Sequence, residues 1–133
     1  MRSVLSDRDH QRLVGVHPDL VRVVERARLA VPFIVVEGLR SKERQAKLVA
    51  IGASRTLNSR HITGHAVDLA YWLDDGDGLP EAGEVRWDWP LARQVAAAMK
   101  AAAQAEGVAL VWGGDWASFP DGPHFELDRR SYP

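Results

Sequence analysis

Helical and extended segments alternate along this chain, and their uneven spacing is the feature that most constrains its fold. Apolar residues recur at helical spacing over Leu20–Ala27, and a short β-rich run follows at Phe33–Val36. A regular βαβ protein would place strands and helices at even intervals. Because these segments are not evenly spaced, we predict an α+β domain with a small, mainly antiparallel sheet packed with helices.

Capping and stop signals define two further helices. Ser41 is suited to cap a helix over Lys42–Ile51, and Gly52 is suited to end it. An alanine-rich helix is predicted from about Pro90 to Glu106, with Gly107 as its stop. Further strands are predicted at about Ala66–Trp72, at Val108–Trp112, and from His124 onward.

Composition excludes several functional classes. A chain of 133 residues with 46% hydrophobic residues suits one compact domain. Its net charge of -1 gives no electrostatic footprint for nucleic acid. The absence of cysteine excludes disulfides, a thiolate nucleophile and cysteine-ligated zinc. Any metal site must therefore use histidine, carboxylates or water.

Targeting signals are also absent from the sequence. The N-terminus is polar and lacks the apolar region of a secretory signal. No run approaches the roughly 20 apolar residues of a membrane span. We therefore expect a protein made in the cytoplasm without a signal peptide and without membrane insertion.

Residues with catalytic potential gather in two clusters, 59–68 and 112–126. In a straight strand His61 and Asp68 would lie about 23 Å apart on opposite faces. Gly64 removes this objection, because a turn at Thr63-Gly64 can return His61 toward the strand that carries Asp68. The pair could be metal ligands or a structural hydrogen-bonded pair.

The second cluster places a carboxylate and an imidazole on either side of a turn. Asp121 precedes His124 by three residues, with Gly122-Pro123 between them. Catalytic zinc sites hold the ion with three protein ligands and leave one position for water. A nearby carboxylate that is not a ligand moves the proton. Asp121 is suited to that second role.

These motifs resemble the zinc peptidases of the LAS family, within the D-alanyl-D-alanine peptidase and VanY-like superfamily. The resemblance covers about residues 5–126 and is strongest to the L-alanyl-D-glutamate endopeptidases of phage lysis systems. It rests on Ser59-x-His61-x-x-Gly64-x-Ala66-x-Asp68, on Asp121-x-x-His124, on Glu37-Gly38-Leu39-Arg40-Ser41 and on Trp112-Gly113-Gly114-Asp115-Trp116.

The resemblance implies a Hedgehog/DD-peptidase-like fold and one zinc ion held by His61, Asp68 and His124. Asp121 would be the general base and then the general acid, and Arg40 would stabilise the oxyanion. Two further residues would bind substrate: Gln45, facing the cleft, and Ser59, which could instead orient the His61 loop.

The implied function is a zinc-dependent peptidoglycan endopeptidase, an endolysin that cuts the L-Ala–D-Glu bond of the stem peptide and lyses the bacterium. Two alternatives stay open: a D-alanyl-D-alanine carboxypeptidase, and a zinc-containing binding module without catalysis. We expect residues 1–133 to form a single catalytic domain, without a separate wall-binding module. We also expect a monomer that reaches the wall through a holin-like release partner.

Other polar residues have competing interpretations. His65 is four residues after His61, but Gly64 disrupts a helix there, so we expect a surface or supporting histidine. Asp115 is a rival to Asp121 as base, and we expect it to shape the loop. Glu126 shares the strand face of His124 and could orient that imidazole or be a solvated carboxylate.

The aromatic residues and an acidic segment leave further alternatives. Trp116 and Phe119 could line the cleft, whereas Trp112 fits a core position under the loop better. Asp74-Asp75-Gly76-Asp77-Gly78 resembles part of a calcium loop but lacks its full spacing, so a solvated turn is the default and Ca²⁺ binding a hypothesis.

Overall fold

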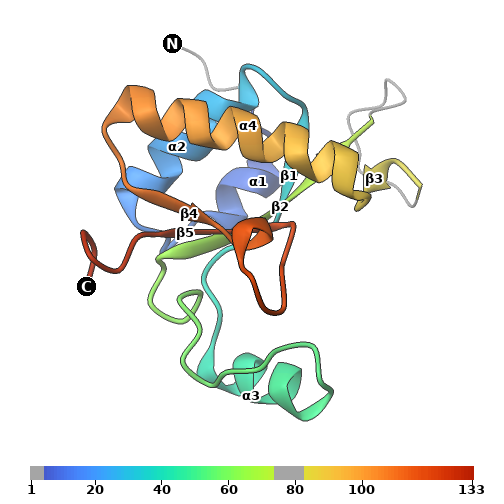
Figure 1. Ribbon diagram of the computed structural model, residues 1–133, viewed down its shortest axis with the longest axis vertical. Coiled ribbons are helices and arrows are strands. Elements are labelled where there is room, and N and C mark those ends of the chain that lie inside the picture. Colours follow the sequence, from blue (N-terminus) through green and yellow to red (C-terminus); the bar gives the residue numbers. More distant parts are fainter. Residues whose placement is uncertain (1–4, 74–82) are drawn as a thin grey trace.

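An antiparallel β-sheet forms the centre of the protein (Figure 1). The computed structural model describes residues 5–73 and 83–133. Within them the strand order is β1-β2-β5-β4, with β3 paired to the end of β2. Every strand pairing is antiparallel, which confirms the predicted fold class. The strands are β1 (Phe33–Glu37), β2 (Ala66–Trp72), β3 (Val85–Arg86), β4 (Leu110–Trp112) and β5 (His124–Leu127).

The helices separate into a main layer and one outlying element. Helices α2 and α4 pack against each other beside the sheet, whereas α3 lies at the opposite end of the molecule (Figure 1). The helices are α1 (Asp7–Arg12), α2 (Pro18–Arg28), α3 (Lys42–Ala50) and α4 (Trp89–Glu106), with a 3₁₀ turn, η1 (Gly113–Asp115). None of the described helices is both long enough and apolar enough to cross a membrane.

Alternation along the strands separates the core from the polar face. Val67 of β2 and Phe125 of β5 are paired, fully buried, and pack with Leu20 and Met99 from the helices. The next pair in this register, Asp68 and His124, must point to the opposite side of the sheet. The main hydrophobic core therefore lies under one face of the central strands. The ionisable groups lie on the other face, together with a smaller apolar cluster of Ile34, Ala70 and Trp72.

The predicted helix signals are confirmed. The Ser41 hydroxyl accepts a hydrogen bond from the Arg44 amide at 3.0 Å and caps α3. Gly107 ends α4 in the left-handed region, at φ 69°. His17 caps α2, because its Nδ1 accepts from the Asp19 amide at 3.0 Å.

Two elements were not predicted, the short helix α1 and the short strand β3. The signal for α1 is a side-chain cap, since the Ser6 hydroxyl accepts from the Asp9 amide at 3.1 Å. The buried Asp9 carboxylate in turn accepts from the Val35 amide at 2.9 Å and ties α1 to β1. Strand β3 has only two residues, Val85 and Arg86, and forms because the end of β2 offers a free edge to pair with.

Candidate active site

Three ionisable side chains form a row across the sheet. Asp68 of β2 is paired with Glu37 of β1 on one side and with His124 of β5 on the other. Directly opposed residues in antiparallel strands project to the same face. The sheet register therefore brings Asp68 together with Glu37, 31 positions earlier in the sequence, and with His124, 56 positions later.

A turn returns His61 to this row, as predicted. Gly64 has φ +77°, and a side chain there would collide with the Gly15 carbonyl oxygen, so glycine is needed at this close approach. The Gly64 carbonyl accepts from the His17 amide at 2.8 Å, which fixes the turn against the start of α2. The Ser59 hydroxyl accepts from the His61 amide at 3.2 Å and holds the beginning of the turn.

His61, Asp68 and His124 form a group that could hold a metal ion, with one ligand atom from each within 4.8 Å of the others. His61 Nε2 lies 3.2 Å from Asp68 Oδ1, and His124 Nδ1 lies 3.5 Å from the same oxygen. Each imidazole uses its other nitrogen elsewhere: His61 Nδ1 contacts the Gly38 carbonyl oxygen at 2.8 Å, and His124 Nε2 contacts Glu126 at 2.8 Å.

This donor set fits a zinc site. Two imidazoles and one carboxylate match the ligands of catalytic zinc, with room for water as the fourth. Metal-binding histidines ordinarily donate their second ring N–H to a carbonyl or a carboxylate, and both acceptors are present here as Gly38 and Glu126. The arrangement would place His61 Nε2 and His124 Nδ1 toward the ion.

The electrostatics of the group favour ionised Asp68 and a cationic His124 when no metal is bound. Burial raises the pKa of Asp68, but hydrogen bonds and charges from His124 and His61 outweigh it and leave that pKa below its usual value. Burial lowers the pKa of His124, but Asp68 and Glu126 outweigh it and raise that pKa to about 9. A divalent ion would take the place of this proton.

Asp121 is held beside the group by backbone contacts. Its amide donates to the Gly113 carbonyl at 3.0 Å, and its own carbonyl accepts from the His124 amide at 3.3 Å. A side chain at Gly113 would lie 2.5 Å from the Asp121 carbonyl oxygen, so glycine permits this close approach. Burial and the nearby Asp68 charge raise the pKa of Asp121. Its carboxylate makes no hydrogen bond to any residue that the structure describes.

Arg40 contacts Asp68 as part of a hydrogen-bonded network. Its guanidinium donates to Glu37, to Gln45 Oε1 at 2.8 Å, and to Asp68 Oδ2 at 3.4 Å. Arg44 also donates to Glu37, at 3.1 Å. Burial raises the pKa of Glu37, but the two arginines outweigh it and hold that pKa below its usual value. Sequence reasoning gave Glu37 no role, although it begins the Glu37-Gly38-Leu39-Arg40-Ser41 motif on which the family resemblance rests.

Gln45 is placed differently from the expectation of a cleft-facing residue. It is 0% exposed, and its amide nitrogen donates to Ser54 Oγ at 2.8 Å and to the Thr56 carbonyl at 2.6 Å. It therefore joins Arg40 to the loop after α3. Ser59, by contrast, lines the pocket as well as holding the His61 turn. Substrate contact by either residue stays a prediction.

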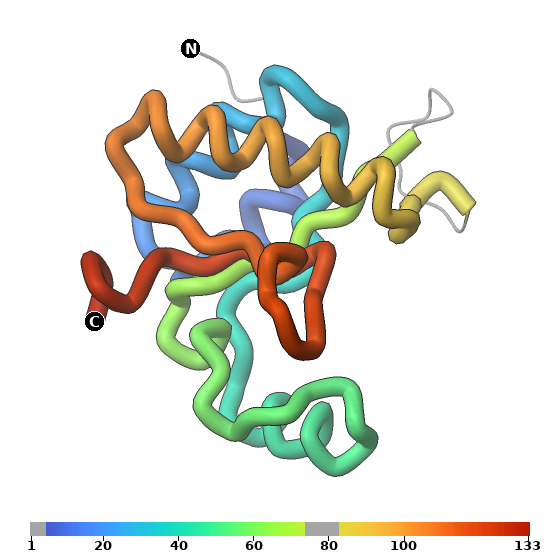
Figure 2. Tube along the Cα trace, viewed as in Figure 1, coloured from blue at the N-terminus to red at the C-terminus, as the bar shows by residue number. Residues whose placement is uncertain are grey.

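The site opens into a pocket of about 790 Å³. One wall comes from α3 and the loop that follows it, and the other from the loop between η1 and β5. Figure 2 shows these two segments approaching each other beside the sheet. Trp116 and Phe119 both line the pocket, as one interpretation expected, and the Trp116 ring centroid lies 5.1 Å from that of His124.

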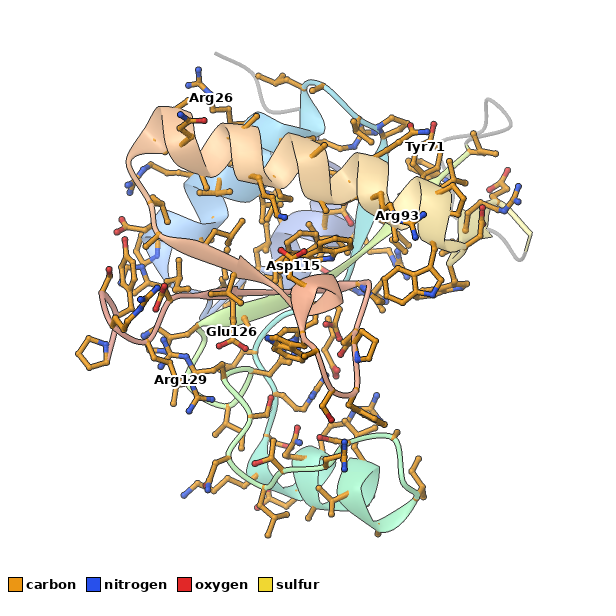
Figure 3. All side chains as sticks on the ribbon, in the orientation of Figure 1. Arg26, Tyr71, Arg93, Asp115, Glu126 and Arg129 are labelled. Carbon is orange, nitrogen blue, oxygen red and sulfur yellow. The ribbon has the colours of Figure 1, made fainter. Side chains whose placement is uncertain are left out.

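The positions of the other candidate residues decide between their competing interpretations. Trp112 is 8% exposed and belongs to the core, as expected. Asp115 lies toward α4 (Figure 3), is paired with Lys100 at 2.7 Å and does not line the pocket, consistent with a loop-shaping residue. His65 is not part of the metal group and contacts Thr63 Oγ1 at 2.7 Å. Residues 74–78, the hypothetical calcium loop, lie outside the described residues.

Comparison with known proteins identifies relatives over nearly the whole chain. The profile of the family described as phage L-alanyl-D-glutamate peptidase matches residues 1–132. The L-alanyl-D-glutamate peptidase of Escherichia phage T5 is 31% identical over 128 residues, covering 92% of this chain and 87% of that protein. The L-alanyl-D-glutamate peptidase of Listeria phage A118 is 32% identical over 99 residues, covering 74% of this chain. That match spans only 31% of the Listeria phage protein.

A solved structure agrees with the fold. The crystal structure of Serratia marcescens L-Ala D-Glu endopeptidase ChiX superposes with a TM-score of 0.84 and 46% sequence identity. The match covers 97% of this chain and 92% of that one.

Proposed function

The chain belongs to the phage L-alanyl-D-glutamate peptidase family, and we propose that it hydrolyses the L-Ala–D-Glu bond of the peptidoglycan stem peptide with one zinc ion. The observation that carries this proposal is the placement of Asp121 beside His61, Asp68 and His124 in one pocket. A purely structural zinc site does not need a non-ligating carboxylate next to the metal.

His61, Asp68 and His124 would hold the zinc ion, which would supply Lewis-acid activation of water and of the scissile carbonyl. Asp121 would take a proton from the attacking water and return it to the departing amide nitrogen. Its raised pKa makes the carboxylate a stronger base toward the proton of the attacking water. A pKa shifted toward the working pH is also the best compromise for a group that must both accept and return a proton.

Arg40 would stabilise the negative charge that develops on the carbonyl oxygen. A guanidinium has five N–H donors, and the described contacts with Glu37, Gln45 and Asp68 use four of them. One N–H on Nη1 has no partner among the described residues, and Arg40 lines the pocket, while the other contacts hold the group rigid. Ser59 lines the pocket wall and would contact the substrate there. Gln45 would act through its hydrogen bond with Arg40.

The family relationship also suggests where the enzyme acts. We propose that it reaches the wall after release by a holin-like partner, that it acts as a monomer, and that residues 1–133 form one catalytic domain. Calcium binding by residues 74–78 stays a separate hypothesis; calcium titration of the pure protein, followed by activity and melting, tests it.

Digestion of purified sacculi by the zinc-loaded protein tests the function. Mass spectrometry of the products should show new D-Glu amino termini paired with new L-Ala carboxyl termini. Release of free D-Ala without new D-Glu termini would show a carboxypeptidase instead. Zinc binding without any new terminus would show a non-catalytic binding module.

A further inference from the structure

Five arginines line the pocket, and their partners differ. Arg40 and Arg44 are paired with Glu37, and Arg129 lies 3.8 Å from Glu126 (Figure 3). Arg60 is buried and donates to the backbone carbonyls of Leu127 and Tyr132. Arg55 is exposed, and its partners among the described residues are neutral.

Arg55 contacts the opposite wall of the pocket. Its Nη1 lies 3.4 Å from Ser118 Oγ, and its guanidinium carbon lies 4.9 Å from the centroid of the Phe119 ring. Phe119 is 51% exposed and has φ 56°, a backbone conformation that is rare for a bulky residue. Ser118 and Phe119 immediately precede the Pro120-Asp121 segment, so Arg55 reaches the loop that carries the proposed base.

The substrate would offer Arg55 a stronger partner. An L-Ala–D-Glu bond uses the amino group of glutamate, so one of the two glutamate carboxyl groups remains free when the other continues the peptide. A hydrogen bond from a guanidinium to a carboxylate is about twice as strong as one to a neutral group. The contact with Ser118 and Phe119 is therefore easily exchanged for one with a carboxylate in the pocket.

We propose that Arg55 is a specificity residue that binds the free carboxylate of the D-glutamyl residue, and that its contact with Ser118 and Phe119 is its resting position in the free enzyme. This inference rests on the proposed function, because the acidic residue beside the scissile bond comes from it. It adds a preference for the free acid over its amide.

Two synthetic peptides test the inference. Both contain L-Ala–D-Glu continued through the glutamate side-chain carboxyl; one carries a free α-carboxylate and the other its amide. The zinc-loaded wild type should cleave the acid with a kcat/KM about 10- to 100-fold higher, chiefly through KM. Arg55→Gln should bring this ratio close to one, and Arg55→Lys should retain part of it.

Arg93→Gln is the matched control. The Arg93 guanidinium also lies over an aromatic ring, that of Trp89 at 6.0 Å, but it does not line the pocket, so the acid-to-amide ratio should stay at the wild-type value. Melting temperatures check that each variant is folded. An unchanged ratio in Arg55→Gln, or no preference in the wild type, would overturn the inference.

Binding separates this inference from the proposed function. The metal-free protein is titrated by calorimetry with the two D-glutamyl product peptides, acid and amide. A preference for the acid that Arg55→Gln abolishes would support the role of Arg55 even if sacculi were cut at another bond. Suppose instead that both peptides are cleaved, and that neither the wild type nor Arg55→Gln distinguishes the acid product from the amide product. That result would leave the proposed function intact and overturn the inference.

Discussion

The Nε2 atom of His124 lies 2.8 Å from the Oε1 atom of Glu126, two residues further along β5. Both side chains project to the same face because side chains alternate along a strand. Glu126 itself is buried at 8% exposure, so this carboxylate is not a solvated one. The contact fixes the imidazole with Nδ1 toward Asp68, and Glu126 therefore positions a proposed metal ligand.

Glu126→Ala should weaken zinc binding by about 10- to 100-fold, the usual effect of removing the partner of a ligating histidine. Competition with a chromophoric chelator measures the affinity. The zinc affinity of Glu126→Gln should lie between those of the wild type and Glu126→Ala, since the glutamine amide oxygen still accepts from His124 Nε2. Glu43→Gln on the exposed first turn of α3 is the control. Wild-type affinity in Glu126→Ala would show that the contact does not support the metal site.

Asp121→Asn should leave zinc binding intact and lower kcat on peptidoglycan by about 100- to 10,000-fold, the usual contribution of a general acid–base. The metal content and the rate of sacculus digestion are both measured. Asp115→Asn is the matched control from the preceding turn, because that carboxylate is paired with Lys100 outside the pocket. If Asp115→Asn lost the activity and Asp121→Asn kept it, the base would be Asp115.

Gly64→Ala should destabilise the protein more than Gly52→Ala does. Both glycines have positive φ, +77° and +80°, so each substitution costs about 1 kcal/mol or more of backbone strain. Only Gly64 faces a neighbour: its added Cβ would collide with the Gly15 carbonyl, whereas nothing lies within 4 Å at Gly52. Urea unfolding of the metal-free variants gives both values. Equal losses would mean that the turn can shift away from Gly15.

Zinc affinity should rise with pH between about 6.5 and 9. The pKa of His124 is raised from 6.5 to about 9 in the metal-free protein, so the ion must displace a proton throughout this range. The same raised pKa stabilises the metal-free fold below the unfolded-state pKa, and this contribution is lost as the pH rises through about 9.

Chelator competition at several pH values measures this dependence, which should approach tenfold per pH unit for one released proton. Calorimetry in two buffers of different ionisation heat counts the proton directly. An affinity that stays constant from pH 6.5 to 9 would show that His124 is already neutral when the metal binds.

Local signals in the sequence were sufficient for most helices and strands. The Ser41 cap, the Gly107 stop and the apolar spacing of Leu20 to Ala27 act within a few residues, so they can be read without the fold. Strand β3 could not be found this way, because its two residues are held only by the edge of β2. Helix α1 has only six residues, which are too few to show a helical spacing of apolar residues.

For the candidate site as well, some features could be predicted from the sequence and others depend on the fold. The residue types and the turn at Gly64 were sufficient to identify His61, Asp68, Asp121 and His124 as candidates. The family relationship adds the chemistry that they would perform. By contrast, Glu37 belongs to a motif that is visible in the sequence, but its contact with Arg40 beside Asp68 depends on the pairing of β1 with β2.

What the sequence determined by itself is therefore the set of chemical groups and the local turns and helices that carry them. Tertiary structure decided which groups meet. Antiparallel pairing sets Asp68 opposite His124. Gln45, expected to face the cleft, is buried and accepts a hydrogen bond from Arg40. Arg55 contacts Phe119 across the pocket. These relations depend on strand register and long-range packing, which a short stretch of chain cannot specify.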